Sequence, residues 1–287
     1  YYFSRIGRIK MEVAIVTDST ADLPQEKIEN YNITIIPLQV AIGGEEFLDQ
    51  VELTTEEFLD KLEVAEELPT TSQPSLGKFI DVYENLAQEY DQILSIHLSE
   101  KFSGTVKTAH TASNMVAEAE IKVIDSETVT VPLGVIVTEA AKAAQEGQNL
   151  EQLVKLIEQL KQEVNIYFTV DELDYLEKGG RIGKATAFLG NLFKIKPILT
   201  IDDGQIGPYK KVRGTRRLYN SFLKLAAELR SSGTNNLIIL HGRYKDKADI
   251  LQEKLMAEYN WDRVQVQKFG SVVGAHIGPT PFGMIIW

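Results

Sequence analysis

The stretch Val13 to Pro24 reads VAIVTDSTADLP, and it predicts the first strand, turn and helix of an α/β fold. Its apolar start, Val13 to Val16, is short and mostly β-branched, which is typical of a buried strand. Pro24 suits the first turn of a helix, where a missing N–H leaves no hydrogen bond unmade. Asp18 and Ser19 would then lie at the carboxyl end of the strand, where ligands of open α/β sheets bind.

The same order of elements returns twice in the first half of the chain. Ile93 to Ile96 runs into a polar turn and then a helix with a narrow face of small residues that begins at Val106. Ile121 to Ile124 ends in Asp125-Ser126, and two helices follow. Buried strands that alternate with helices predict a parallel sheet covered by helices on both faces.

The pattern changes near residue 165. Two apolar segments, Ile195 to Ile201 and Gln205 to Val212, flank Asp202-Asp203-Gly204, and Asp-Gly between two strands predicts a hairpin. Amphipathic helices and further short strands follow, among them Val272 to His276 and Met284 to Trp287. A hairpin among other strands indicates a sheet that is partly antiparallel.

We therefore predict an α/β protein with two domains. Residues 11–165 form an N-terminal three-layer domain around a parallel sheet, and residues 166–287 form a C-terminal mixed-sheet domain with helices on one face. Residues 1–10 precede the internal Met11 and are predicted to be an upstream or tag-derived extension that takes no part in the fold.

Composition excludes several classes of protein. The chain has 287 residues, of which 44% are hydrophobic, but no apolar run reaches the ~18 residues of a membrane span. Zero cysteines exclude disulfides, a thiol nucleophile and thiolate metal sites, and they fit the cytoplasmic location that we expect. The net charge of −11 argues against nucleic acid as a general partner.

Positive charge is nevertheless concentrated in one segment. Leu176 to Arg217 contains ten lysine and arginine residues but only three acidic residues. This asymmetry predicts a docking face for an anionic partner, with ordinary solvated surface lysines as the alternative.

Two turns rich in hydroxyl groups are candidates for binding an anion. Leu68 to Leu76 reads LPTTSQPSL, a loop made rigid by its two prolines, and Ser75 can cap the helix that follows. Ser103-Gly104-Thr105 opens another helix directly after a strand. Because helix N-termini present free N–H groups, the two turns can converge on one carboxylate or phosphate. Simple helix capping is the alternative for each.

His276 is the most informative histidine of the chain. It ends a predicted strand of small residues and precedes Gly278-Pro279, where it can donate to an anion or serve only the fold. The sequence lacks the Gly-x-Ser-x-Gly, Walker A, Gly-x-Gly-x-x-Gly and His-Glu-x-x-His motifs. We therefore predict neither a metal nor a cofactor.

These motifs together resemble the DegV family over nearly all of residues 11–287. Their order and spacing make the resemblance specific. The landmarks are VTDSTADL at 16–23, TSQPS at 71–75, FSGT at 102–105, DS at 125–126, LEKGGRIG at 176–183, KPIL at 196–199 and HIGP at 276–279.

The resemblance implies a two-domain protein that binds one long-chain fatty acid, such as palmitate, stearate or oleate, between its domains. It implies that Thr71 and Ser103 hold the carboxylate, together with the N–H of Gly104. His276 fits the family's supporting histidine, and Arg213 is the candidate for its supporting arginine. Apolar residues after the Gly-Gly-Arg turn are interpreted as walls of the acyl-chain pocket, with ordinary core packing as the alternative: Phe188, Leu189, Leu192 and Phe193.

Some members of this family are FakB-type carriers. They present the fatty acid to a separate ATP-dependent fatty acid kinase, which makes an acyl phosphate for phospholipid synthesis. By resemblance, the chain would be the non-catalytic, lipid-binding partner of such a kinase. Arg181 and Lys184 would lie on the surface that docks the kinase, and the same basic face would touch an anionic membrane transiently.

The chain departs from the family pattern in two places. Thr280-Pro281 stands where Gly-Ala usually follows Gly-Pro, and TVPLG at 130–134 replaces a Ser-Met-Gly run. We expect these differences to alter the acyl-chain pocket and not the carboxylate site.

Two other functions are compatible with the same residues. An esterase or thioesterase would use Ser103 as nucleophile and His276 as base, although the strained nucleophile turn and an orienting acid are missing. A regulatory sensor would bind a small molecule without stimulating any kinase.

Overall fold

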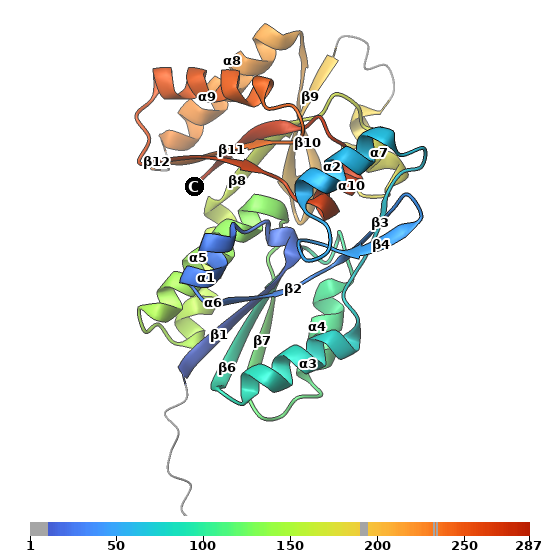
Figure 1. Cartoon of the computed structure of the whole chain (residues 1–287). Helices are drawn as coiled ribbons and strands as arrows, with labels where there is room; N and C mark the ends of the chain where they lie inside the picture. The colour runs from blue at the N-terminus through green and yellow to red at the C-terminus, as the bar shows by residue number, and fades with distance from the viewer. Residues whose placement is uncertain (1–10, 190–194, 232, 234) are drawn as a thin grey trace, which may run out of the picture.

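The structure is a computed structural model that describes residues 11–189, 195–231, 233 and 235–287. Residues 1–10 and the predicted pocket residues Leu192 and Phe193 therefore lie outside the described residues. The chain forms two domains of sheet and helix that lie one above the other, and a smaller third sheet lies at their side (Figure 1). Within the described ranges, no helix combines the length and apolar character that crossing a membrane requires.

A four-stranded parallel sheet forms the centre of the N-terminal domain, in the order β2-β1-β6-β7. Neighbouring residues of a strand point to opposite faces, so Leu94 packs beneath α5 and α6 while Ile93 packs against α3 and α4. The predicted three-layer parallel domain is therefore confirmed. Its strands are β1 (Met11–Asp18), β2 (Ile33–Ile36), β6 (Tyr90–His97) and β7 (Glu120–Asp125). Its helices are η1 (Ser19–Ala21, a 3₁₀ turn), α1 (Gln25–Asn30), α3 (Leu76–Ala87), α4 (Thr105–Ser113), α5 (Thr130–Gln145) and α6 (Leu150–Glu163).

Residues 39–72 leave the parallel sheet and form a separate unit, which we call the flap. In it, β3 (Gln39–Ile42) pairs antiparallel with β4 (Glu45–Leu48) and β5 (Thr70–Ser72), and α2 (Thr55–Val64) covers them. The Thr71 stretch was predicted to be a rigid loop, but three of its residues form β5. The loop continues to Ser75, whose Oγ accepts the N–H of Lys78 and caps α3 as predicted.

The C-terminal domain contains a mixed six-stranded sheet in the order β10-β9-β8-β13-β11-β12. Its strands are β8 (Asn165–Thr169), β9 (Ile195–Asp202), β10 (Gln205–Arg213), β11 (Asn236–His241), β12 (Arg263–Lys268) and β13 (Phe282–Ile286). Among the described strands of this sheet, only β11 and β12 pair in parallel. The predicted hairpin joins β9 to β10, with Asp203 and Gly204 both at positive φ. Helices α8 (Thr215–Arg230) and α9 (Asp246–Glu258) cover one face of the sheet.

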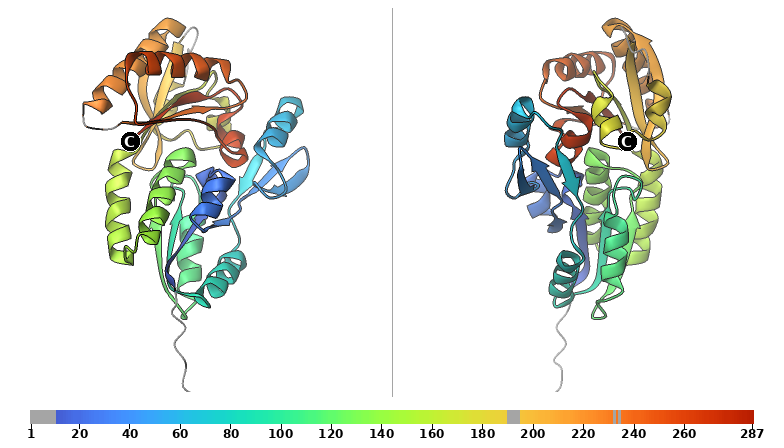
Figure 2. Two further views of the ribbon diagram at one scale, coloured as in Figure 1. Left: turned by 60° about the vertical axis from the view of Figure 1, so that its left-hand side comes forward. Right: turned by 90° about the vertical axis from the view of Figure 1, so that its right-hand side faces the viewer.

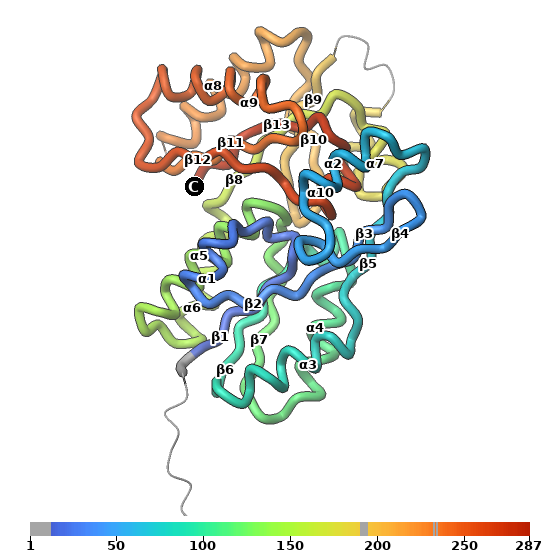
Figure 3. The backbone as a smooth tube through the Cα atoms, in the orientation of Figure 1, coloured from blue at the N-terminus to red at the C-terminus, as the bar shows by residue number. Residues whose placement is uncertain are grey.

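One predicted element of this domain is wrong. Val272 to His276 was predicted to be a strand, but Ser271–Ile277 is a helix, α10. This helix is wedged between the flap and the C-terminal sheet (Figures 2 and 3), and Phe58 of α2 lies so close to Gly274 that a Cβ there would clash. Tertiary packing therefore overrides the strand preference of its valines.

The second face of the C-terminal sheet is turned toward the N-terminal domain. Ile238 and Leu240 of β11 pack there with Val131 of α5 and Val273 of α10 in one apolar cluster. The short helices α7 (Asp174–Lys178) and η2 (Gly183–Phe188, a 3₁₀ helix) close the side of this cluster. The two domains thus share a hydrophobic core, and the cavity described next lies within it.

Candidate functional site

A cavity of about 310 Å³ lies where both domains, the flap and α10 meet. Most of its wall is apolar and includes Leu38, Leu98, Phe102, Ile206, Leu240 and Val273. Polar groups are few, and they include Thr71, Gln73, Ser103, Gly104, Arg181 and His276. A largely apolar hollow with a small number of polar groups has the character of a site for an amphipathic small molecule.

Among the polar residues of the lining, Thr71 and His276 are hydrogen-bonded to each other across the cavity wall. Thr71 is held in β5, where it pairs with Val40, and His276 lies in the last turn of α10. The Thr71 Oγ1 is 2.8 Å from Nε2 of His276. This hydrogen bond ties the flap to the C-terminal domain at the wall of the cavity.

The Ser103 turn reaches the same wall from the N-terminal domain. Gln73, two residues after Thr71, donates from its amide to Oγ1 of Thr108 at 2.6 Å, and any Cβ at Gly104 would collide with its amide oxygen. The hydroxyl of Ser103 lies 2.9 Å from that of Thr105. The two hydroxyl-bearing turns singled out in the sequence therefore touch each other and line one cavity.

Two arginines lie elsewhere than expected. Arg181, predicted to dock a partner, lines the cavity, and its guanidinium donates to the carbonyls of Phe102 at 3.2 Å and Gly179 at 2.7 Å. Arg213, predicted to support the carboxylate, ends β10 with an exposed side chain and does not line the cavity. The sequence did not distinguish them, because Arg181 follows a glycine turn and Arg213 ends a strand, and neither local pattern says whether the side chain faces the cavity.

Lys184 behaves as a surface residue. It is exposed and pairs with Asp202 at 2.7 Å, beside the turn of the β9–β10 hairpin. A role of Lys184 in docking a partner therefore stays a prediction.

The electrostatics of the polar lining favour a neutral imidazole on His276 beside the positively charged guanidinium of Arg181. Burial lowers the pKa of His276 to about 4, and the nearby positive charge of Arg181 contributes in the same direction. Within the described residues, Nδ1 of His276 has no hydrogen-bond partner, and it lies against Gly179, where a Cβ would crowd it. At neutral pH the positive charge of this wall therefore resides on Arg181.

A second hollow of about 180 Å³ adjoins the first. Thr71, Arg181 and His276 line both hollows, and Tyr175 and Lys178 line only the smaller one. These three shared residues therefore lie between the apolar cavity and the second, more polar hollow.

The geometry does not support the esterase alternative. His276 bonds Thr71 instead of Ser103, and no carboxylate of the described residues contacts its Nδ1. A serine–histidine–aspartate connection does occur elsewhere, through Ser95, His97 and Asp18. All three side chains are fully buried and none lines the cavity, so they are not placed to attack a substrate.

Of the residues predicted to form the acyl-chain walls, the structure describes Phe188 and Leu189. Phe188 and Leu189 pack half-buried against the interdomain cluster, but neither lines the cavity. The walls come instead from α10, from the Phe102 turn and from β10 and β11. Sequence reasoning missed these residues because each looks like ordinary core in its own element.

No metal centre is indicated by the part of the chain that the structure describes. Within it, no group of histidine, aspartate and glutamate side chains is arranged to hold a metal ion.

Comparison with known proteins gives a consistent result. The model of the DegV family of uncharacterised proteins matches residues 12–287. Protein DegV of Bacillus subtilis is 37% identical over 279 residues, which cover 96% of this chain and 99% of that protein. Its crystal structure, described as that of a fatty acid binding protein, has a TM-score of 0.88 at 36% identity, with 96% and 99% coverage.

Two further solved structures share the whole fold. A DegV family protein from Thermus thermophilus, described by its fatty acid binding, has a TM-score of 0.90 at 33% identity and covers 96% of this chain and 99% of its own. A stearic-acid-binding protein from Eubacterium ventriosum has a TM-score of 0.85 at 29% identity, with coverage of 96% and 97%.

Proposed function

Because the chain belongs to the DegV family, we propose that it is a carrier that binds one long-chain fatty acid between its two domains and performs no chemistry on it. One observation carries this proposal: an apolar cavity whose polar lining brings together two hydroxyls, an imidazole and a guanidinium. Relatives that match this chain over nearly its whole length are described as fatty acid binding, which supports the same ligand class here.

The carboxylate would be held by Thr71, Ser103 and the N–H of Gly104, with Arg181 supplying the opposite charge. A carboxylate buried without donors is very costly, so a site of this kind needs several. The neutral His276 can donate from Nε2 to the oxygen of Thr71, which leaves the hydrogen of Thr71 for the ligand. We assign to Arg181 the role that the family resemblance suggested for Arg213, since Arg181 lines the cavity and Arg213 does not.

The acyl chain would occupy the apolar part of the cavity. Burying about fourteen methylenes at ~0.8 kcal/mol each contributes on the order of 11 kcal/mol. Association and ordering cost at least ~4 kcal/mol of this, so burial of the acyl chain alone gives a Kd of about 10 µM at best, and the contacts of the carboxylate must supply any tighter binding. Palmitate, stearate and oleate are the ligands that we propose to test.

We further propose that the carrier presents the carboxylate to a separate ATP-dependent kinase in the cytoplasm. The polar group adjoins the smaller hollow, which contains Lys178, so a phosphoryl donor can approach the carboxylate from that side. The exposed basic residues between Leu176 and Arg217, Lys184 among them, would dock the kinase or an anionic membrane during exchange of the lipid.

The decisive experiment is extraction of the purified protein with organic solvent and identification of the lipid by mass spectrometry. We expect one long-chain fatty acid per chain. Thr71→Ala combined with Ser103→Ala should reduce retention, whereas Thr111→Ala, an exposed hydroxyl on α4, should not. Full retention by the double variant would contradict the proposed carboxylate site.

Two assays separate the alternatives. Hydrolysis of a nitrophenyl ester that disappears in Ser103→Ala would indicate an esterase. Binding of palmitate without any stimulation of acyl phosphate formation by a DegV-associated kinase would indicate a sensor and remove the kinase part of the proposal.

A further inference from the structure

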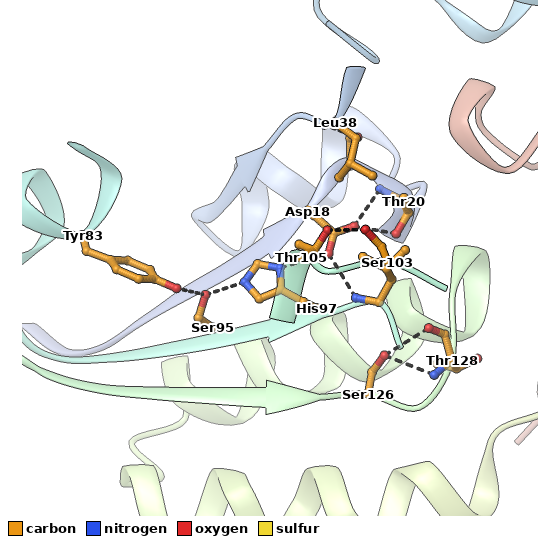
Figure 4. A network of polar contacts seen from close by, with 12 residues as sticks. Asp18, Thr20, Leu38, Tyr83, Ser95, His97, Ser103, Thr105, Ser126 and Thr128 are labelled. Carbon is orange, nitrogen blue, oxygen red and sulfur yellow. Dashed lines mark hydrogen bonds and ion pairs between the residues drawn. The ribbon is translucent and has the colours of Figure 1, made fainter. Parts of the chain in front are cut away.

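A relay of buried polar side chains runs from Tyr83 of α3 to the central strands β6 and β1 of the parallel sheet (Figure 4). The hydroxyl of Tyr83 lies 2.8 Å from that of Ser95, which in turn lies 2.7 Å from Nε2 of His97. On the other side of the ring, Nδ1 of His97 lies 2.9 Å from Oδ2 of Asp18. The proposed carboxylate site uses none of these four side chains.

The carboxylate of Asp18 sets the direction of this relay. Its Oδ2 accepts the N–H of Leu98 at 3.0 Å, and its Oδ1 accepts both the N–H and the hydroxyl of Thr20. With the hydrogen of the His97 ring on Nδ1, the imidazole donates to Oδ2, and Asp18 accepts hydrogen bonds at both of its oxygens. Four donors then surround the carboxyl group of Asp18, whose side chain is buried.

The remaining hydrogen bonds of the relay follow from this tautomer. With its hydrogen on Nδ1, the His97 ring accepts at Nε2, so Ser95 donates to it and Tyr83 donates to Ser95. Because the Tyr83 hydroxyl is the donor to Ser95, a proton on Nε2 would instead leave the Ser95 hydroxyl hydrogen without an acceptor among these groups. The direction of donation therefore runs from Tyr83 to Asp18.

The relay ends on the backbone of the turn that carries Ser103. Leu98, whose N–H Asp18 accepts, follows β6 and lines the cavity. The same turn is held from β7, because Asp125 accepts the N–H of Glu100 at 3.3 Å and the carbonyl of Thr128 accepts the N–H of Ser99 at 2.8 Å. The aspartates that end β1 and β7 thus both hold the backbone of this turn.

Ser19 does the same for the opposite wall. Its Oγ accepts the N–H of Leu38 at 3.1 Å, and Leu38 lines the cavity directly before β3 and the flap. Adjacent residues of one motif therefore fix the backbone of two cavity residues that lie 60 positions apart.

We propose that Asp18 is a positioning residue for the fatty-acid carboxylate, which it affects only through the N–H of Leu98 and the turn that carries Ser103. This inference rests on the proposed function. Asp18 itself does not line the cavity, so its effect on binding must pass through the backbone it holds.

The first test is Asp18→Asn, with palmitate affinity and thermal stability measured side by side. Either orientation of the new amide turns its NH₂ toward two donors, those on Leu98 and His97 or the two on Thr20. We expect palmitate affinity to fall about tenfold, the loss typical of one charge-assisted hydrogen bond. Ile93→Val, which opens a small gap in the same strand β6, is the matched control: it should lower Tm and leave affinity within twofold.

The second test separates positioning from general destabilisation. If Asp18 acts through the Ser103 turn, then Asp18→Asn should cost about threefold or less in a Ser103→Ala background. Fully multiplying effects of the two substitutions, or wild-type affinity in Asp18→Asn, would overturn the inference.

A pair of variants at His97 serves if Asp18→Asn does not fold. In His97→Asn the side-chain amide can donate to Asp18 in place of Nδ1, whereas His97→Leu cannot. We expect His97→Asn to keep palmitate affinity within about threefold and His97→Leu to lose about tenfold. Equal affinities of the two variants would contradict the relay.

The outcome also distinguishes this inference from the proposed function. If the wild-type protein binds no fatty acid, the proposed function fails. If it binds palmitate and the Asp18 and His97 variants bind it equally well, only the positioning role fails.

Discussion

The hydroxyl of Thr71 lies 2.8 Å from Nε2 of His276, although 205 positions separate the two residues in the chain. Thr71 belongs to the flap of the N-terminal half, and His276 belongs to α10, near the end of the chain. Their hydrogen bond therefore closes one wall of the cavity only when the whole chain has folded. It also joins two of the groups that we propose for the carboxylate.

A double-mutant cycle should measure this connection. We expect Thr71→Val and His276→Gln each to weaken palmitate binding about tenfold, because each removes one link of the chain from imidazole to hydroxyl to carboxylate. The double variant should lose clearly less affinity than the product of the two single losses, since the second substitution breaks a chain of hydrogen bonds that is already broken. Calorimetric titration with palmitate provides the affinities, and strictly multiplying losses would show that the two residues act independently.

Arg181 and Arg213 offer a matched comparison of two arginines. Arg181→Gln should weaken palmitate binding several-fold at pH 8, where the carboxylate is ionised, and should affect the uncharged palmityl alcohol little. Arg213→Gln should leave both affinities unchanged, because its side chain lies outside the cavity. A loss of palmitate affinity in Arg213→Gln equal to that in Arg181→Gln would restore the interpretation made from sequence.

His276 should make the ligand-free protein less stable in mild acid. Its pKa is about 4 in the folded protein, against an ordinary value of 6.5, so between these values the unfolded chain binds a proton that the folded chain does not. Its contribution is complete above pH 6.5 and is lost as the pH falls toward 4, a change on the order of 3 kcal/mol. Urea unfolding at several pH values should show this loss, and His276→Gln should remove that part of the slope. An unchanged slope in the variant would contradict the lowered pKa.

Asp22 should act in the opposite direction. Burial raises its pKa to about 8, and Thr130 donates to its Oδ2 at 2.6 Å. Between pH 4 and 8 the folded protein keeps a proton that the unfolded chain releases, so stability declines as the pH rises toward 8. Buried Asp49, whose pKa is raised to about 6, adds a similar decline at lower pH.

Asp22→Asn tests this effect because the amide has the shape of the protonated acid without a titratable proton. We expect its free energy of unfolding to depend less on pH between 6 and 8 than that of the wild-type protein. Asp262→Asn, at an exposed position, is the control and should keep the wild-type slope. A wild-type slope in Asp22→Asn would show that Asp22 is ionised throughout this range.

Local pattern was sufficient to predict the order of elements in the N-terminal domain. The buried strands ending in Asp18-Ser19 and Asp125-Ser126 lie where the sequence predicts them, because a short apolar run followed by a polar turn is a local signal for a buried strand. The hairpin at Asp203-Gly204 was equally predictable, since two positive φ angles in succession favour this residue pair.

The site was predictable only in part. Thr71, Ser103, Gly104 and His276 line the cavity, and each carries a local mark, either a hydroxyl-bearing turn or a histidine before Gly-Pro. Arg181 lines the cavity and Arg213 does not, and no local pattern tells which arginine side chain faces inward. Phe102 belongs to the FSGT motif, but no local pattern indicates that its ring lines the cavity.

The sequence by itself determined the strand-turn-helix order, the hairpin and the placement of hydroxyl groups at two turns, because these depend on residues a few positions apart. Tertiary structure alone decided that Ser271–Ile277 is a helix, that Asp18 holds Leu98, and that Arg181 lines the cavity while Arg213 does not. These outcomes depend on the free energy of burying surfaces from distant segments against one another, and that free energy is not encoded in the spacing of neighbouring residues.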